Sequence, residues 1–491
     1  MPTNLENLQT AITGFYGALA AKLSTRRLIS DSYSRTETDA QHWRIASLAG
    51  GAHPNGMTYR KAGWIMRDGS LRLSGESWRG SNAHGTSQPW LGQPATVMLP
   101  AGHGKITQAI LNTLGPSLAL DDSGNVYGWG TGAYGGNGSV SGDVYVATKL
   151  NISGLNVGEK ITALETSGNG YLDSDAAGGI ASAYLRSDAN RLWACGYNAF
   201  GQLGLSDTNN RFVPVLVTAL TGIAAVSAAG GQYGHALALT TGGSVKAWGY
   251  NAQGQLGIGS TVNASSPQSV SLPSAASKVL AQRYCSYALL ANGDVYAWGY
   301  NAYGQLGVGD TTQRTSPVKI TALSGVADIW CGGGDHGVLY AKKATGELYA
   351  CGYNGYGQLG VGDTTQRNTP VLLYASGQAQ AVQIAVGGHL SYGWLALLDT
   401  SGALWSCGYN GNGQLGHGDT STRNSLTRVP VALPPGVSIS AIRTAGYSTE
   451  GALHLLLSDG SALACGYNGA GALGVGASDQ QARYLLSRVA I

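Results

Sequence analysis

The chain has 491 residues and a net charge of +3, and it lacks the basic clusters that neutralise nucleic-acid phosphates. Charged residues make up only 11% of it, against roughly 25% in ordinary soluble proteins, whereas Gly reaches 76 residues and Tyr 26. The sequence also has no run of 18 apolar residues and no basic start followed by an apolar core. It therefore argues against nucleic-acid binding, membrane insertion and a secretory signal.

Residues 1–41 predict a short N-terminal α-helix followed by a polar linker, as a domain separate from 42–491. Thr3 and Glu6 match a capping box. The apolar residues that follow alternate in steps of three and four, as in a coiled-coil seam: Leu5, Leu8, Ile12, Phe15 and Leu19. So short a helix is marginal alone in water, so its stripe must pack on something. Docking on the rest of the chain and association into a homo-oligomer or larger assembly both stay open, and we favour association.

The remainder, 42–491, is organised around one stretch of ten residues that recurs along the chain. It reads CGYNAFGQLG at 195–204. Close copies stand at 248–257, 298–307, 351–360 and 407–416, and weaker ones at 129–138 and 465–474. An eroded further unit lies at 63–75. A repeat with a period near fifty residues indicates a repeat architecture.

Each unit contains the material for about four strands. An apolar run, a Gly-containing turn and an alternating run precede the repeated stretch and read as a β-hairpin, as at 285–299. A polar loop and another short strand follow, as at 316–320. The prediction is an all-β fold, a β-propeller of seven to eight four-stranded blades, with eight if 63–75 belongs to a full blade.

The run HALALTTGGSVKAWGYNAQGQLGIG, residues 235–259, resembles the repeat of the regulator-of-chromosome-condensation family. The resemblance covers roughly residues 44–491 and implies a β-propeller, usually of seven blades. It also implies a ring closed by pairing N-terminal and C-terminal strands, with 483–491 ending one unit and 42–50 beginning the next. Members of the family act on partner proteins through one propeller face, as exchange factors for a small GTPase or as inhibitors of enzymes.

The residue before the first Gly of each repeated stretch is either Trp or Cys. Trp129, Trp248 and Trp298 fill this position in some units, and Cys195, Cys351, Cys407 and Cys465 fill it in others. Equivalent positions in different blades lie too far apart for the roughly 5.5 Å Cα separation of a disulfide. We therefore expect all six cysteines of the chain to be free, and these four to be buried.

No pattern of catalytic residues is present. The sequence has neither GxSxG nor HExxH, and its Gly-rich strings lie in blade turns. The polar loops that contain Asp310 and Arg314, Asp363 and Arg367, and Asp419 and Arg423 are copied from unit to unit, so they read as turns with local ion pairs. We expect no enzyme activity, no metal and no cofactor.

One position varies while its neighbours barely change, namely the residue before Gly-Gln-Leu-Gly. It is aromatic in several units, and an insertion at 167–184 adds one more aromatic residue. The candidate partner-binding residues are Tyr134, Phe200, Tyr303, Tyr356 and Tyr171. Exposed aromatic residues are typical of contact surfaces, but packing against the neighbouring blade stays open. His235 and His336 are expected at the start of an apolar strand; they could line the ring face or the channel, but we favour ordinary structural histidines.

Two functions stay open. The preferred one is a non-enzymatic propeller displayed on a virion, phage tail or other extracellular assembly, where it contacts a protein or a cell-surface glycan. Low charge, near-identical units and the N-terminal stripe favour it. The alternative is a cytoplasmic regulator that binds a partner protein through one propeller face.

Overall fold

The structure is a computed structural model in which residues 1–44 and 45–491 form separate units. The described residues are 45–48, 61–76, 83, 90–111, 116–130, 144–166, 181–333, 336–374, 380–388, 391–445, 449–476 and 481–490. The predicted helix, with Leu5, Leu8, Ile12, Phe15 and Leu19, lies outside them, as do Tyr134 and Tyr171. The one helical element within them is the 3-10 turn η4 (Gly469–Gly471), and no helix there could span a membrane.

The first four blades take up the N-terminal half of the second unit. Blade 1 contains β1 (Ile45–Leu48), β2 (Lys61–Met66), β3 (Leu71–Glu76) and β4 (Trp90–Thr96). Blade 2 contains β5 (Ile106–Ile110), β6 (Pro116–Asp121), β7 (Val126–Gly130) and β8 (Val144–Lys149). Blade 3 contains β9 (Ile161–Thr166), β10 (Ser182–Ser187), β11 (Leu192–Gly196) and β12 (Arg211–Leu216). Blade 4 contains β13 (Ile223–Ala228), β14 (His235–Thr240), β15 (Val245–Gly249) and β16 (Ala264–Val270).

The last four blades follow in the same order. Blade 5 contains β17 (Ala276–Gln282), β18 (Cys285–Leu290), β19 (Val295–Gly299) and β20 (Arg314–Lys319). Blade 6 contains β21 (Val326–Gly332), β22 (Val338–Lys343), β23 (Leu348–Gly352) and β24 (Arg367–Tyr374). Blade 7 contains β25 (Ala381–Gly387), β26 (Trp394–Asp399), β27 (Leu404–Gly408) and β28 (Arg423–Arg428). Blade 8 contains β29 (Ile439–Ala445), β30 (Ala452–Leu457), β31 (Ala462–Gly466) and β32 (Arg483–Arg488).

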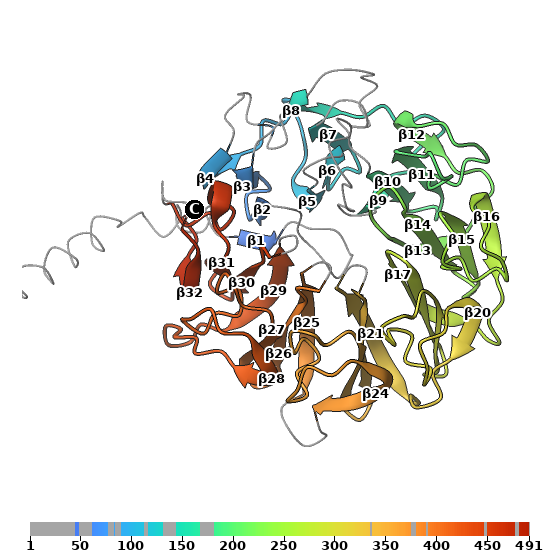
Figure 1. Ribbon diagram of the computed structural model, residues 1–491. Coiled ribbons are helices and arrows are strands. Elements are labelled where there is room, and N and C mark those ends of the chain that lie inside the picture. Colours follow the sequence, from blue (N-terminus) through green and yellow to red (C-terminus); the bar gives the residue numbers. More distant parts are fainter. Residues whose placement is uncertain are drawn as a thin grey trace, which may run out of the picture. The chain divides into compact units, whose positions relative to one another are not determined.

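The eight sheets stand around a ring, which confirms the predicted propeller and decides for eight blades (Figure 1). Each sheet is an antiparallel meander of four consecutive strands, with the first strand toward the centre and the fourth at the rim. The eroded unit at 63–75 supplies β2 and β3 of a full blade.

This topology puts the repeated stretches that the structure describes on one face of the ring. In a meander, the first-to-second and third-to-fourth connections leave the sheet at the same end, and the second-to-third turn leaves at the other. The repeated stretches run on from the third strands, as 298–307 does from β19. We call this side of the propeller the loop face, and the opposite side, which carries turns such as the one at Asn292, the turn face.

The Trp or Cys position forms the core between adjacent blades, as predicted. Trp248 and Trp298 are fully buried, and their Nε1 atoms donate to the carbonyl oxygens of Gln202 and Gln255 in the preceding blade, at 2.6 and 2.8 Å. The indole lies so close to Gly257 that a Cβ there would approach Trp298 Nε1 to 2.7 Å. Gly257 has a φ of +69°, so its conformation as well as the close approach favours glycine.

In several blades the size of this side chain is matched by its neighbour across the hairpin, whereas blade 3 pairs the small Ala183 with Cys195. Trp248 pairs with Ala236 in blade 4, whereas Cys351 pairs with Leu339 in blade 6, and all four side chains are buried. Blade 7 repeats the second arrangement with Leu395 opposite a cysteine. Two different pairs therefore fill equivalent volumes between blades.

All six cysteines are buried free thiols, which confirms the prediction. Burial raises the pKa of Cys195 and of Cys285 to about 12.

The ring closes by packing between separate sheets, so the expected strand pairing between the two ends is wrong. β32 ends blade 8 and β1 begins blade 1, but they belong to different sheets. Blade 1 has the small Ser74 in the Trp or Cys position, and Trp64 on the neighbouring strand fills the space. Its ring lies against Gly474 and 6.1 Å, centroid to centroid, from His454 of blade 8.

Side chains bridge the first strands of some adjacent blades near the channel. Gln108 Oε1 accepts from Leu164 N at 2.9 Å, and its Nε2 donates to Leu164 O at 2.7 Å. Gln383 likewise bridges to β29 of blade 8, where its Nε2 donates to Ser440 O at 2.8 Å and its Oε1 accepts from Ile442 N at 3.0 Å. The equivalent residue between blades 3 and 4 is Ala163, which cannot reach across, and a cavity of about 160 Å³ lies there.

Candidate protein-binding surface

The repeated residues of each stretch hold the loop together from inside. Asn301 is buried, and its Oδ1 accepts from Leu306 N while its Nδ2 donates to the carbonyl oxygens of Asp310 and Thr312, at 2.9 to 3.1 Å. Gln305 Oε1 accepts from Tyr303 N at 2.9 Å. These side chains recur because the loop needs their hydrogen bonds. The side chain of Tyr303 makes no such bond to its own loop among the described contacts, so this position can vary.

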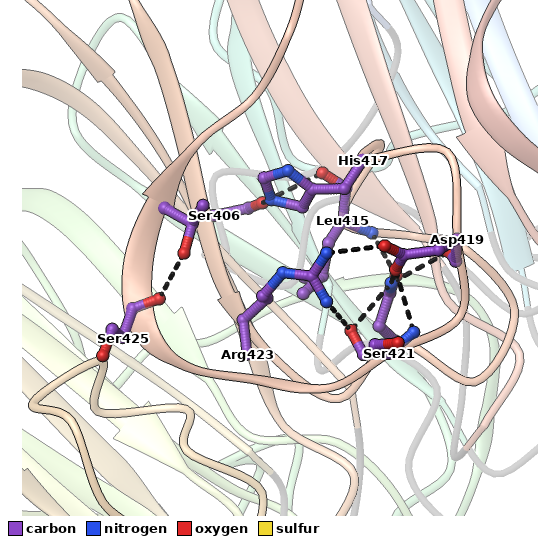
Figure 2. Close-up of polar contacts among 9 residues, drawn as sticks. Ser406, Leu415, His417, Asp419, Ser421, Arg423 and Ser425 are labelled. Atoms are coloured by element: carbon purple, nitrogen blue, oxygen red, sulfur yellow. Dashed lines mark hydrogen bonds and ion pairs between the residues drawn. The ribbon is translucent and has the colours of Figure 1, made fainter.

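The Asp and Arg residues of the polar loop that follows each stretch form ion pairs with each other, as predicted. Figure 2 shows the example in blade 7, where Arg423 Nη2 lies 2.7 Å from Asp419 Oδ2 and Ser421 N donates to Asp419 Oδ1 at 2.9 Å. The hydrogen bond from Arg423 is the main cause that lowers the pKa of Asp419. The same ion pair joins Asp310 to Arg314 and Asp363 to Arg367, and a fourth, Asp207 with Arg211, was not anticipated.

Blade 7 differs from its neighbours beside this loop. His417 stands where other units have an aliphatic residue, and its Nε2 lies 3.0 Å from Ser406 Oγ (Figure 2). Burial lowers the pKa of His417, so neutral imidazole is favoured. Ser406 is fully buried and its hydroxyl donates to Leu415 O at 2.9 Å, so this pair does not form an accessible nucleophile with its base.

The three described candidate residues, Phe200, Tyr303 and Tyr356, are half-buried on the loop face. Each contacts two rings of the next blade. The centroid of Phe200 lies 5.6 Å from Tyr233 and 5.2 Å from Tyr250. Each ring therefore packs on the neighbouring blade and is still partly exposed, and contact with a partner stays a prediction.

Two more junctions repeat this arrangement. Tyr303 lies 4.3 Å from His336 and 5.3 Å from Tyr353. Tyr356 lies 5.2 Å from Tyr392 and 5.3 Å from Tyr409. Position by position these triads match that of Phe200, with one residue before the Gly-Gln of one blade and two from the blade that follows.

The triads form a band across blades 3 to 7. Tyr353 of the second triad is close enough to Tyr356 of the third to raise its pKa. Tyr300 lies 6.3 Å from Tyr303 and 6.2 Å from Tyr284, and the guanidinium of Arg283 lies 4.9 Å over the ring of Tyr284. Arg283 is also close enough to Tyr250 to act on its pKa. We call this band the aromatic arc. Its members are Phe200, Tyr233, Tyr250, Arg283, Tyr284, Tyr300, Tyr303, His336, Tyr353, Tyr356, Tyr392 and Tyr409.

Four tyrosines of the arc are held in the uncharged form near neutral pH. Burial raises the pKa of Tyr250, Tyr353, Tyr356 and Tyr409, and neighbouring phenols add to the effect. The ion pairs of the loops beside the arc are internally neutral. The arc therefore presents aromatic surface and hydroxyl groups.

Sequence reasoning found one member of each triad and missed the other two. The Tyr of the repeated Gly-Tyr-Asn, as in Tyr353, was a usable signal, because a half-buried aromatic residue recurring after every third strand must share one face. His336 was placed wrongly. β22 begins at Val338, so His336 lies in the preceding loop, whereas His235 does begin β14 and is buried with its Nε2 2.7 Å from Ser286 Oγ.

The arc has the character of a contact surface. The rings in each triad touch one another at centroid separations of 4.3 to 5.6 Å, which leaves no space for a cation between them. Packed tyrosines are rigid and combine apolar area with hydroxyl groups, the properties of binding hot spots. No group of three possible metal ligands occurs among the described residues.

The chain belongs to the family described as "Regulator of chromosome condensation (RCC1) repeat". The family model matches residues 190–239, 242–289, 292–339, 345–393 and 401–449, which include all of the arc. This confirms the resemblance seen in the sequence.

The chain is similar to named members. It is 30% identical over 297 residues to the Ultraviolet-B receptor UVR8 of Arabidopsis thaliana, which covers 60% of this chain and 52% of that protein. It is 45% identical over 84 residues to Protein RCC2 of Mus musculus, covering 17% of this chain and 16% of that one. The chain thus spans about half the length of the plant receptor that it matches.

Solved structures share the fold. The chain resembles yeast RCC1 (Prp20) in its complex with Kap60, with a TM-score of 0.54 and 17% identity over 93% of this chain and 87% of that one. A second structure of Prp20p from Saccharomyces cerevisiae gives a TM-score of 0.54 at 16% identity over 93% and 90%, and its description reports binding to Gsp1p and histones. At these identities the likeness establishes the propeller fold alone.

Proposed function

We propose that the chain is a non-enzymatic binding protein that holds a partner protein on its loop face. The observation that carries this proposal is the aromatic arc, a band of half-buried rings over five blades. Family membership supports it, because Prp20 is described as binding Kap60, Gsp1p and histones. The alternative of a partner-binding regulator is therefore preferred. The virion and phage-tail interpretation gains no support from UVR8, RCC2 or Prp20, none of which is viral.

In each loop, one set of residues fixes the backbone and a different residue is left to contact a partner, which supports the proposal. The buried Asn and Gln side chains and the Asp–Arg pairs fix the backbone of each loop. The residue before Gly-Gln-Leu-Gly differs between blades, as Tyr303, Gln253 and Asn412 do, without changing that backbone. A scaffold with one free position per blade can present a particular set of side chains to one partner.

Site-specific photocrosslinking tests the proposal. A benzoylphenylalanine residue at Tyr303 or at Tyr356 on the loop face is compared with one at Asn292, an exposed position on the turn face. In extracts of the source cells, we expect a discrete protein adduct from the two loop-face positions and none from Asn292. Adducts from Asn292 alone would place the partner on the other face and refute the proposal.

A further inference from the structure

We propose that two neighbouring triads of the aromatic arc, those of Tyr303 and Tyr356, bind an uncharged, proline-rich segment of the partner in the polyproline II conformation. This rests on the proposed function, since it specifies the chemistry of the partner held on the loop face.

The rings of these two triads follow one another across blades 5, 6 and 7. Tyr353 lies 5.3 Å from Tyr303, and Tyr409 lies 5.3 Å from Tyr356, in both cases between ring centroids. Tyr353 is also close enough to Tyr356 to raise its pKa, so the first triad adjoins the second. All four rings are half-buried. Because each ring is held by its neighbours, little side-chain freedom is lost when a ligand stacks on this row.

The backbone of the loops that carry these rings is already hydrogen-bonded, as blade 6 shows. Asn354 is buried, and its Oδ1 accepts from Leu359 N while its Nδ2 donates to Asp363 O, both at 2.9 Å. Gln358 Oε1 accepts from Tyr356 N at 2.9 Å. A partner that binds by adding a β-strand requires a row of unpaired backbone N–H and C=O groups. The loop uses these groups internally, so recognition has to come from the rings.

The rings present hydroxyl donors beside apolar faces. Among the described contacts, the hydroxyl groups of Tyr303 and Tyr409 take part in no hydrogen bond. Burial raises the pKa of Tyr409, so its proton stays on the oxygen and can be donated. A proline residue supplies a carbonyl acceptor without an N–H donor, and the polyproline II helix leaves its carbonyl groups exposed. Such a segment is complementary to phenol donors, and its pyrrolidine rings pack on aromatic faces.

A charged segment does not fit this surface. The carboxylate of Asp363 is paired with Arg367 at 2.6 Å, and that of Asp419 with Arg423 at 2.7 Å. Arg283 is 8% exposed and already has a partner, so it adds no charge to the row. A charge on the ligand would therefore lose water here without gaining an opposite charge.

A neutral oligosaccharide would stack on the same rings but would find few partners for its hydroxyl groups. The amide side chains of the repeated stretches are directed into their own loops, as Asn354 and Gln358 are, so they do not reach a ligand. Polar groups that lose water without a new hydrogen bond weaken binding. A proline-rich segment has fewer such groups and is favoured.

Phage display on the full chain tests the inference, with random peptides of about twelve residues. Peptides enriched on the wild-type protein are labelled with fluorescein, and their affinities are measured by anisotropy beside copies in which each proline is replaced by alanine. We expect proline to be enriched over the unselected library and charged residues to be depleted. The alanine copies should bind at least about fivefold more weakly, because they lose ring contacts and the preformed extended shape.

Substitutions taken from other blades locate the site. Tyr303→Gln, the residue of blade 4, and Tyr356→Asn, the residue of blade 7, should each weaken binding of the proline-rich peptides about tenfold, as for a hot-spot ring. Tyr303→Phe, the residue of blade 3, keeps the ring and should weaken binding about two- to tenfold through loss of one hydrogen bond. Tyr296→Gln is the matched control and should leave the affinity unchanged, because Tyr296 is also half-buried but follows the turn of blade 5 on the turn face. Unchanged circular dichroism and melting temperature show that the variants are folded.

Several results would overturn the inference: no enriched peptides, no excess of proline, enrichment of charged peptides, equal affinity of the alanine copies, or triad variants that bind as the wild type does. Binding of neutral oligosaccharides on a glycan array, lost in Tyr303→Gln, would replace the peptide with a glycan. These failures are distinct from failure of the proposed function, because loop-face crosslinks without a proline preference would refute only the inference.

Discussion

Blade 4 offers a direct test of how the blades pack, through the pair Ala236 and Trp248. The double replacement Ala236→Leu with Trp248→Cys would reproduce the pair Leu339 and Cys351 of blade 6. The surroundings already match, because Tyr184 of the preceding blade donates to Gln202 O as Tyr287 donates to Gln305 O. We therefore expect the double variant to be far more stable than the two single variants imply.

The magnitudes follow from burial. Trp248 is fully buried and packs edge-to-face on Tyr184 at 6.1 Å, so Trp248→Cys alone should cost about 3–4 kcal/mol through the cavity that it leaves. The Gln202 carbonyl keeps its bond from Tyr184, so no buried acceptor is left without a donor. Ala236→Leu alone forces a larger side chain against the indole and should cost about 1–3 kcal/mol. The double variant should lose only about 1–2 kcal/mol.

These free energies of unfolding are measured by urea denaturation, monitored by backbone circular dichroism because the variants change a tryptophan. The double-mutant cycle should give a favourable coupling of about 3 kcal/mol, near the upper end for residues in contact. Ala297→Leu with Trp298→Ala serves as a control, because these consecutive residues point to opposite faces of the sheet and do not share one volume. Additive costs, with a coupling below about 0.5 kcal/mol, would refute the idea that the two positions share one volume.

Four more predictions concern the cavity at Ala163, the cysteine thiols, the ring closure at His454 and the N-terminal segment. Ala163→Gln should fill the cavity as Gln108 fills its own junction and raise the free energy of unfolding by about 0.5–2 kcal/mol; a fall in urea denaturation would contradict this. The six cysteines should be inert to thiol reagent in the native state and all react after denaturation without reductant; fewer than six would reveal a disulfide. Burial lowers the pKa of His454 from 6.5 to about 4, so the unfolded chain binds a proton first as the pH falls. The free energy of unfolding should therefore decrease as the pH is lowered from 6.5 to about 4. His454→Leu should remove that slope, and an unchanged slope would contradict the assignment. Ile12→Asp with Phe15→Asp should reduce the mass in solution to that of a monomer while the propeller stays folded; unchanged mass of an associated wild type would exclude the predicted seam.

The fold was largely predictable because the sequence of each repeat contains all the local features of a blade. The hairpin turns, the Gly positions and the Trp or Cys position recur in register, so each copy supports the others. Blade 1 was the ambiguous case for the same reason. Its Trp or Cys position is Ser74 and its bulk comes from Trp64 on the other strand, so the volume is kept while the sequence pattern is lost.

The candidate surface was predictable only in part. Variation at Tyr303 among nearly constant neighbours identified a position outside the loop's own hydrogen bonds. Its partners His336 and Tyr353 come from the next blade, and a contact between units is not visible in the period of either one. Variation of the residue before Gly-Gln-Leu-Gly therefore indicated exposure, whereas the arc could be recognised only from the arrangement of the blades in space.

The family repeat and the blade are out of phase, and this offset explains why the same protein has a uniform core and a varied surface. The matched segment 190–239 begins before β11 of blade 3 and ends in β14 of blade 4, so one repeat covers a junction between two blades. The repeated Gly-Gln-Leu-Gly lies in the first third of that segment and packs on Trp248 or its equivalents, so the interface is copied with each unit. The residues at Phe200 and Tyr233 also fall within one segment, on either side of the junction, whereas Tyr250 belongs to the next segment. A single repeat thus carries two of the three rings of a triad, and a change in one unit alters one contact of the arc without disturbing the core beneath it.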